Sequence, residues 1–429
     1  MTIIDEKKVE DLLFVVSYGS QTIKIYFRFK IKSNPMRLFL LFSIILFNSN
    51  LIRSQESIEM YKSASLSFYS HYWNDSIQCQ LAIPVSYSTN MEQDSMPLLL
   101  LFDQQNSTSF NYHLRSINFL TGAAAQIPEL LVAGIPFPPN KRFWLTDSDP
   151  RTGDSISGIE RTAKMLFEEL IPTFEKRYPA VNYLIIAGHS RTGWLVNYLL
   201  AHYPENVNAA GSFSSFFETE EVIAKLVKLA QNEKGNSHYF FMTAGNSFEE
   251  QTYMTQLGKM AERLDTTTKN PRFRWSFQVL PNVNHITNFG LSLPIMLTDL
   301  FIPYNKILGS WFAGKQDSLR GLDAVNQLIK DFEQLPYPIH PQLLHWYSLT
   351  SHYYNTNDYE TARLFLEVGL EYYPDEPGLM LFMAEVLQLQ QNTEEALRYL
   401  ENFEKLMKTQ DFIKGAEMDE LWDWYESLN

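Results

Sequence analysis

Cysteine and positive charge are both scarce in this sequence of 429 residues. The single cysteine, Cys79, excludes a disulfide within the chain and any cysteine-rich metal site. It lies in an alternating stretch from Ser76 to Ile83, where a half-buried strand residue is expected rather than a nucleophile. Lys and Arg total 35 against 49 Asp and Glu, which gives a formal net charge of −14. An acidic chain without a basic stripe has no electrostatic footprint for nucleic acid, so nucleic acid is not an expected partner.

Long apolar runs and cofactor motifs are also missing. No stretch reaches the roughly 18 uninterrupted apolar residues of a transmembrane helix, so none is expected in the mature protein. The sequence has no His-Glu-x-x-His, no dinucleotide-binding glycine pattern, and no phosphate loop in which Gly-x-x-x-x-Gly-Lys leads into Ser or Thr. We therefore expect neither a cofactor nor a metal.

The N-terminal residues 1–54 are predicted to be a leader. Met36 and Arg37 precede an apolar run from Leu38 to Phe47, which is too short to span a bilayer but fits a signal peptide over residues 36–54. A buried core helix is the alternative, and Ile52 stands where a cleavage site usually has a small residue. Residues 1–35 are interpreted as an over-extended start. The prediction is an exported bacterial protein, periplasmic or extracellular.

Residues 55–306 alternate short apolar runs with amphipathic ones. The expected strands are Pro97–Phe102, Leu130–Ile135, Tyr183–Ala187, Tyr239–Thr243 and Trp275–Leu280, and the expected helices are Gly158–Tyr178 and Trp194–Tyr203. Continuous apolar strands separated by helices indicate a mainly parallel sheet covered on both faces. In such sheets the chemistry lies at the carboxyl ends of the strands.

The C-terminal part has a different pattern. Residues 307–340 are assigned to a linker, and residues 341–429 to a small all-α domain that resembles tetratricopeptide repeats. The repeat positions are Trp346, Leu349, Tyr353, Ala362, Leu366, Gly369 and Pro374, and a shift of about 34 residues gives Met380, Met383, Leu387, Ala396, Leu400 and Phe403. Two repeats are too few to be stable alone, so we expect them to dock on the preceding domain, together with a last helix that contains Leu421, Trp422 and Trp424. A generic helical bundle is the alternative.

The strongest chemical signal is the stretch from Tyr183 to Trp194, in which a buried strand runs through Gly188-His-Ser190 directly into a helix. A nucleophile elbow requires this context, because a sharp strand-to-helix turn lifts the serine hydroxyl above the sheet. Ser190 is therefore the predicted nucleophile, and the backbone N–H of Arg191 is a predicted oxyanion donor. The motif is incomplete, since Thr192 occupies the second glycine position and Gly193 follows it.

A serine nucleophile needs a base and an acid, which follow it in chain order in this type of fold. Of nine histidines, only His285 comes after the end of a later strand, so it is the predicted base. After the strand Tyr239–Thr243 come Glu249 and Glu250. Glu249 is the predicted acid and Glu250 its close rival; each could equally be a carboxylate at a helix N-terminus.

These pieces in this order resemble the esterase family that includes esterase D, enterochelin-type siderophore esterases and feruloyl esterase domains. The resemblance covers most of residues 60–305 and depends on Leu98–Asp103, Leu131–Ile135 with Arg142, Phe167–Pro172, Ala187–Gly193, Ala244–Glu249 and Pro281–His285. It implies an α/β-hydrolase fold and a second oxyanion donor, the backbone N–H of Gln104. Exported bacterial members carry C-terminal tetratricopeptide-like repeats. Two departures are Thr192 and the lack of a proline in Gly211–Phe217.

The expected function is hydrolysis of carboxylic esters through an acyl-enzyme on Ser190, His285 and Glu249. Acyl transfer by the same residues is one alternative. A non-catalytic scaffold that uses the helical repeats is another. The expected partners are a small-molecule, glycan or siderophore ester and a protein or peptide on the repeats. The sequence does not reveal which ester is the substrate.

Overall fold

The computed structural model of the protein describes residues 13–18, 21–26, 60–85, 96–178 and 181–410. The chain divides into two compact units, one formed by Met1–Ile58 with Asp411–Asn429 and the other by Glu59–Gln410. In the first unit, β1 (Leu13–Tyr18) and β2 (Gln21–Tyr26) pair as antiparallel strands. The predicted signal peptide, residues 36–54, and the predicted last helix lie outside the described residues.

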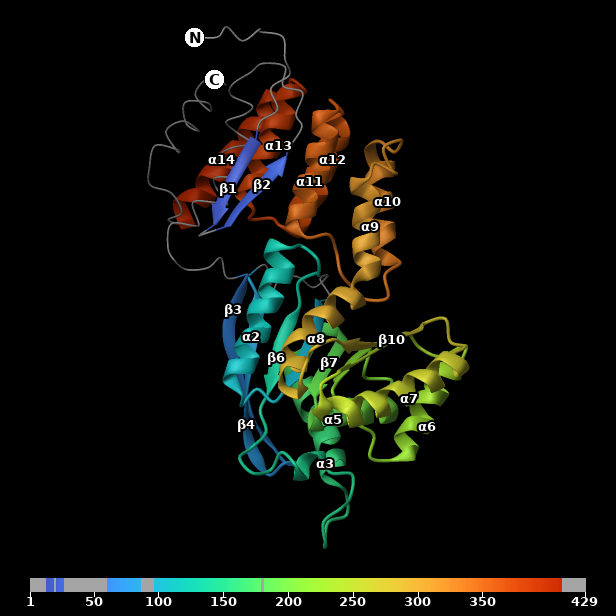
Figure 1. The fold of residues 1–429 in the computed structure, drawn as a ribbon. Helices are drawn as coiled ribbons and strands as arrows, with labels where there is room; N and C mark the ends of the chain where they lie inside the picture. The colour runs from blue at the N-terminus through green and yellow to red at the C-terminus, as the bar shows by residue number, and fades with distance from the viewer. Residues whose placement is uncertain (1–12, 19–20, 27–59, 86–95, 179–180, 411–429) are drawn as a thin grey trace, which may run out of the picture. The chain divides into compact units, whose positions relative to one another are not determined.

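The second unit is built on an eight-stranded sheet with the order β10-β9-β8-β7-β5-β6-β4-β3 (Figure 1). The strands are β3 (Tyr61–Ser70), β4 (Asp75–Pro84), β5 (Met96–Phe102), β6 (Leu131–Ile135), β7 (Val181–His189), β8 (Ala209–Phe213), β9 (His238–Gly245) and β10 (Phe273–Leu280). All neighbours from β10 to β6 are parallel, whereas β6, β4 and β3 are antiparallel. The five expected strands all occur in the parallel part.

Helices cover both faces of the sheet. They are α2 (Ser107–Asn118), α3 (Gly158–Lys164), α4 (Ile171–Arg177), α5 (Arg191–His202), α6 (Glu220–Gln231), α7 (Gln251–Thr267) and α8 (His285–Leu300). Ala210 of β8 belongs to the buried cluster that contains Leu195 of α5, while the next residue, Gly211, faces Met296 of α8. Because successive strand residues point to opposite faces, α5 and α8 lie on opposite sides of the sheet. The predicted α/β-hydrolase fold with a doubly covered sheet is confirmed.

The antiparallel pair β3 and β4 forms the edge of the sheet. Cys79 lies on β4 opposite Leu66 of β3, and its side chain is completely buried. Burial raises the pKa of the Cys79 thiol to about 12. The expected strand position is confirmed, but the thiol is fully rather than half buried.

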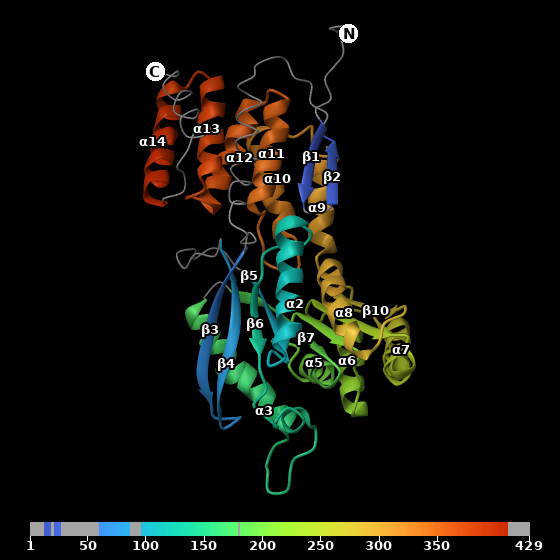
Figure 2. The same cartoon turned by 60° about the vertical axis from the view of Figure 1, so that its left-hand side comes forward.

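Beyond α8 and up to Gln410, the secondary-structure elements are all helices, joined by loops. They are α9 (Ile302–Phe312), α10 (Gly321–Glu333), α11 (Leu343–Asn355), α12 (Tyr359–Tyr372), α13 (Pro377–Leu389) and α14 (Thr393–Gln410). Figure 2 shows α11 to α14 following one another as neighbouring rods. The starts of α13 and α14 follow those of α11 and α12 at the spacing on which the repeat prediction depends. The all-helical character is confirmed, and the assignment to tetratricopeptide repeats stays a prediction.

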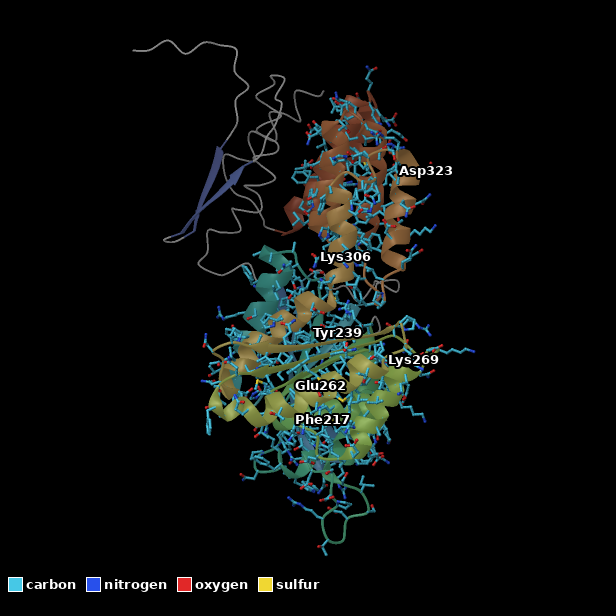
Figure 3. The ribbon with its side chains drawn as sticks, turned by 45° about the vertical axis from the view of Figure 1, so that its right-hand side comes forward. Phe217, Tyr239, Glu262, Lys269, Lys306 and Asp323 are labelled. Carbon is cyan, nitrogen blue, oxygen red and sulfur yellow. The ribbon has the colours of Figure 1, made fainter. Side chains whose placement is uncertain are left out.

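The linker assigned to residues 307–340 differs from the structure, because this segment contains most of α9 and all of α10 (Figure 3, where Lys306 and Asp323 mark the two helices). In α10 the buried residues Ala324, Val325, Leu328 and Phe332 recur at helical spacing, and this apolar face stabilises a helix where a linker was expected. The prolines at positions 336, 338 and 341 lie after α10.

Contacts join the helical part to the α/β part within the same unit. The Asn305 and Gln342 side-chain amides donate to the main-chain carbonyls of Gln126 (2.7 Å) and Ile127 (3.3 Å). The buried Tyr337 ring lies 5.7 Å from that of Tyr183 on β7. Through these contacts the helical part packs directly against the α/β part.

Among the described residues, no single helix has the length and apolar composition of a membrane span. Taken together, α8 and α9 meet the same two criteria, but the pair is bent by 55°, as in a broken span.

Candidate active site

Ser190 occupies the turn between β7 and α5. Its backbone has φ 56° and ψ −116°, a conformation that non-glycine residues rarely adopt. The Ser190 N–H donates to the carbonyl of Phe213 at the end of β8 (2.8 Å), which fixes the turn to the neighbouring strand. A Cβ atom at Gly188 would lie 2.4 Å from the carbonyl oxygen of Thr192, so only glycine permits this close approach. The strain and the glycine together define a nucleophile elbow.

His285 is the first residue of α8, just after β10. Its Nδ1 lies 2.6 Å from Oε1 of Glu250. The ring of Tyr253 stacks on the imidazole, with centroids 4.5 Å apart and planes at 22°. The ring of His189, the neighbour of Ser190, lies 4.5 Å from that of His285. The structure therefore brings the predicted nucleophile segment and the predicted base to the same edge of the sheet.

Glu250 is completely buried and accepts three hydrogen bonds. Besides His285, Ser214 Oγ (2.6 Å) and the N–H of Gly245 (2.7 Å) donate to its carboxylate. Burial opposes ionisation, but the hydrogen bonds from His285, Ser214 and Gly245 outweigh it and hold the pKa of Glu250 below its ordinary value. A buried, ionised carboxylate on Nδ1 leaves the other ring nitrogen, Nε2, free to act as a base.

The choice of Glu249 differs from this geometry, because Glu249 is exposed and Glu250 makes the hydrogen bond. A short 3₁₀ turn, Phe248–Glu250, follows Ser247, and the Glu250 N–H donates to the Ser247 carbonyl (3.1 Å). This turn directs residue 250 inward and residue 249 outward. The sequence left the two carboxylates open, and the turn geometry that separates them has no signature in the residues.

Asp103, at the end of β5, links the elbow to the loops on its other side. Its carboxylate accepts a bidentate pair from Arg142 (2.5 and 2.7 Å) and the hydroxyl proton of Thr192 (2.9 Å). The same hydroxyl accepts the N–H of His189 (3.0 Å). Thr192 is thus a structural part of the elbow, and Gly193, whose Cβ would lie 2.6 Å from Ser215 Cβ, supplies the close contact one position later.

The two predicted oxyanion donors have different surroundings. Arg191 is the first residue of α5, so no carbonyl inside the helix can pair with its N–H. The positive end of the helix dipole lies at the same place. The N–H of Gln104 instead donates to the carbonyl of Ile135 on β6 (3.3 Å). The resemblance implied that this N–H is an oxyanion donor, but in the structure it is paired with the main chain of the neighbouring strand.

Two groups near the site were not singled out from the sequence. Ser214 has φ 42° and directly follows β8, and no motif marks it. His189, the residue before Ser190, packs on the ring of His285. In the described part of the chain, no three His, Cys, Asp or Glu side chains are grouped so as to hold a metal ion.

A serine at a strained strand-to-helix turn, with a histidine and a buried carboxylate on later loops of a parallel sheet, defines a serine hydrolase of the α/β-hydrolase class. The chain belongs to the family described as "Putative esterase", which matches residues 70–290, just over half of its length. It is therefore an esterase. No curated protein matches the sequence significantly.

Solved structures agree with the fold. An IroE-like serine hydrolase from Shewanella oneidensis has 16% identity and a TM-score of 0.58 over 73% of this chain and 99% of its own. An uncharacterised protein from Capnocytophaga ochracea DSM 7271 has 15% identity and a TM-score of 0.56 over 80% of this chain and 93% of its own. At such identities the likeness concerns the fold alone.

Proposed function

We propose that the protein hydrolyses carboxylic esters through an acyl-enzyme formed on Ser190, with His285 as the base and Glu250 as the acid. One observation carries the proposal: the hydrogen bond between His285 Nδ1 and the buried Glu250, at the edge of the sheet where the strained turn holds Ser190. This replaces Glu249 of the sequence-based scheme.

In the first step, Ser190 Oγ attacks the ester carbonyl and its proton passes to Nε2 of His285. Glu250 fixes the tautomer that leaves Nε2 unprotonated and stabilises the imidazolium that forms. His285 then protonates the departing alcohol, and the acyl group stays on Ser190. Water, deprotonated by His285, attacks the acyl-enzyme; the bond between the acyl group and Ser190 Oγ breaks, His285 returns the proton to Oγ, and the carboxylic acid leaves.

The negative charge on the carbonyl oxygen needs donors during both steps. The N–H of Arg191 is the donor we assign, because it is unpaired within α5 and lies next to the nucleophile. The N–H of Gln104 could join only after release from the Ile135 carbonyl.

The test is a fluorophosphonate probe together with p-nitrophenyl ester turnover. Wild-type protein should be labelled, and Ser190→Ala and His285→Ala should each lose turnover by a factor on the order of 10⁶. Ser348→Ala, which changes a serine on α11, is the matched control and should keep both probe labelling and ester turnover. Wild-type-like turnover by folded Ser190→Ala would remove the basis of the mechanism.

Product analysis separates hydrolysis from acyl transfer. In the presence of a competing alcohol, an esterase releases mainly the free acid, whereas an acyltransferase releases mainly the new ester. A panel of p-nitrophenyl, feruloyl and siderophore-lactone esters would identify the small-molecule substrate class.

Export is proposed on the leader sequence alone. Expression of the chain from Met36 in a bacterium, followed by fractionation and N-terminal mass analysis, should show a protein outside the cytoplasm that has lost residues 36–54. An uncleaved chain in the cytoplasmic fraction would contradict it.

A further inference from the structure

His189, the residue directly before Ser190, contacts the helix that carries His285. Its Nε2 lies 2.6 Å from the main-chain carbonyl oxygen of His285. A carbonyl oxygen can only accept, so Nε2 carries the proton and donates. This hydrogen bond joins the end of β7 to the beginning of α8.

The ring of His189 also packs along α8. It lies 4.5 Å from the ring of His285 and 5.4 Å from that of Phe289, with planes only 14° apart in the second pair. Residues four apart share one helix face, so the His189 ring covers the face of α8 on which the proposed base lies.

The backbone of His285 is held on both sides. Before it, Asn284 Oδ1 accepts the Thr287 N–H (2.9 Å), and Thr287 Oγ1 accepts the Asn284 N–H (3.1 Å), which is a capping box. After it, the carbonyl is held by His189. Because the Cα–Cβ bond of His285 lies between these two restraints, they orient its imidazole.

His189 is suited to this position because it stays neutral. Burial lowers its pKa to about 4, with a further contribution from the adjacent His285. The hydrogen bond to the His285 carbonyl and the charges of Glu250 and Asp103 oppose this shift, and His113 of α2 also interacts electrostatically with the ring. A neutral ring adds no positive charge beside an imidazolium at His285.

We propose that His189 is a positioning residue for His285, which sets the distance between the nucleophile elbow and the N-terminus of α8 through its hydrogen bond to the His285 carbonyl. The inference rests on the proposed function. Its role is to keep Ser190 and His285 in register, without touching the substrate.

Three substitutions separate the hydrogen bond from the packing. His189→Gln retains a donor at the same number of bonds from the backbone as Nε2. His189→Phe keeps the ring but loses the donor, and the His285 carbonyl keeps its bond within the helix. His189→Asn keeps an amide, but its side chain is one methylene too short to reach the His285 carbonyl. It therefore replaces His189→Phe as the variant without the hydrogen bond if the phenylalanine variant does not fold. His113→Phe is the matched control, because it replaces a neighbouring buried histidine without removing this bond.

We expect kcat to fall by roughly 10- to 100-fold in His189→Phe and His189→Asn, since small displacements of reacting groups cost this much. KM should stay unchanged. His189→Gln and His113→Phe should keep kcat close to that of the wild type. Equal kcat in folded His189→Phe and wild type, or equal losses in His189→Gln and His189→Phe, would overturn the proposal.

A second readout does not need turnover. The Nδ1 proton of His285 on Glu250 should give a shifted NMR resonance in wild type and His189→Gln, and this resonance should move or broaden in His189→Phe. An unchanged resonance in His189→Phe would contradict the positioning role. Failure of the proposed function would appear separately, as the absence of Ser190-dependent turnover in the wild type.

Discussion

Glu250 illustrates how a buried charge is accommodated at the scale of one residue. A carboxylate without solvent contact is unstable unless its oxygens are hydrogen-bonded. His285, Ser214 and the N–H of Gly245 supply these bonds. The resulting carboxylate has a fixed direction as well as a charge, which is what an acid that orients a histidine requires.

Glu250→Gln should therefore lower kcat by roughly 10²–10⁴, because an amide can stabilise the wrong tautomer of His285. Glu249→Gln is the matched control, since the neighbouring side chain is exposed. Steady-state ester turnover of the two variants measures the difference. A larger loss in Glu249→Gln would show that the acid is residue 249 after all.

Thr192→Val should destabilise the protein by about 1–3 kcal/mol, because the partly buried N–H of His189 and the carboxylate of Asp103 lose a partner. Thr192→Ser, which keeps the hydroxyl, should have a much smaller effect. Urea unfolding of both variants provides the measurement. Equal stability of Thr192→Val and wild type would mean that the hydroxyl is dispensable to the elbow.

The residues of the site differ in how well the sequence predicted them. Ser190 and His285 could be placed because strand and helix patterns on either side restrict where such residues can lie. Glu249 and Glu250 could not be separated, since a single 3₁₀ turn decides which one points inward. Ser214 left no signal at all, because its role depends on a turn that only the folded chain forms.

At the scale of elements, the turn from β7 to α5 depends on the absence of one side-chain atom. Gly188→Ala should cost more than about 1 kcal/mol and lower kcat, because its Cβ would meet the Thr192 carbonyl at 2.4 Å. Gly309→Ala in α9 is the control: no atom lies within 4 Å of its Cβ, so stability should rise by about 0.5–1 kcal/mol. Thermal unfolding distinguishes these opposite signs, and a stabilised Gly188→Ala would show that the elbow can widen.

The connection between α9 and α11 depends on Tyr337. It is 2% exposed, its ring packs on Phe301 (4.9 Å between centroids), and its hydroxyl accepts the N–H of Tyr304. Tyr337→Ala should destabilise the unit by about 3 kcal/mol or more, whereas Leu344→Ala, at a side chain that is 53% exposed, should change little. If calorimetry shows two separate transitions with only the second shifted, the helical part folds independently.

Among the elements, β5, β6, β7 and β9 were predictable because strands buried on both faces are continuously apolar. The strand β8, Ala-Ala-Gly-Ser-Phe, was not. Its small residues are required by close packing, since a Cβ at Gly211 would lie 2.4 Å from Met296 Sδ. Close packing thus leaves β8 with a single residue, Phe213, of the β-branched and aromatic types that mark a strand.

At the scale of the whole molecule, buried histidines make stability depend on pH. Burial lowers the pKa values of His113 and His345 from 6.5 to about 4. His345 Nδ1 also accepts the Gln342 N–H (3.0 Å), and protonation there would break that bond.

These histidines bind fewer protons in the folded state than in the unfolded state. Stability is therefore fully present above pH 6.5 and is lost as pH falls from 6.5 towards 4, at up to about 1.4 kcal/mol per pH unit for each histidine. Urea unfolding between pH 7.5 and 5 should show this decline, and His113→Phe should reduce its slope. Stability that stays constant over this range would mean that the rings are accessible to protons.

The general architecture followed from periodicity, whereas the boundary between the α/β and helical parts did not. Residues 307–340 were assigned to a linker, but α10 lies within this range, ends just before the prolines at 336, 338 and 341, and packs in the same unit. Proline marks where a helix cannot continue. It does not mark where a domain ends.

The solitary, fully buried thiol of Cys79 has a practical consequence. A reagent that modifies thiolates can react with Cys79 only after the pair β3 and β4 opens, because the side chain is inaccessible and burial raises its pKa to about 12. With one cysteine in the chain, every modified molecule reports one such event. The rate at which Cys79 is modified, followed by mass, therefore measures how often the β3–β4 edge of the sheet opens in the native protein.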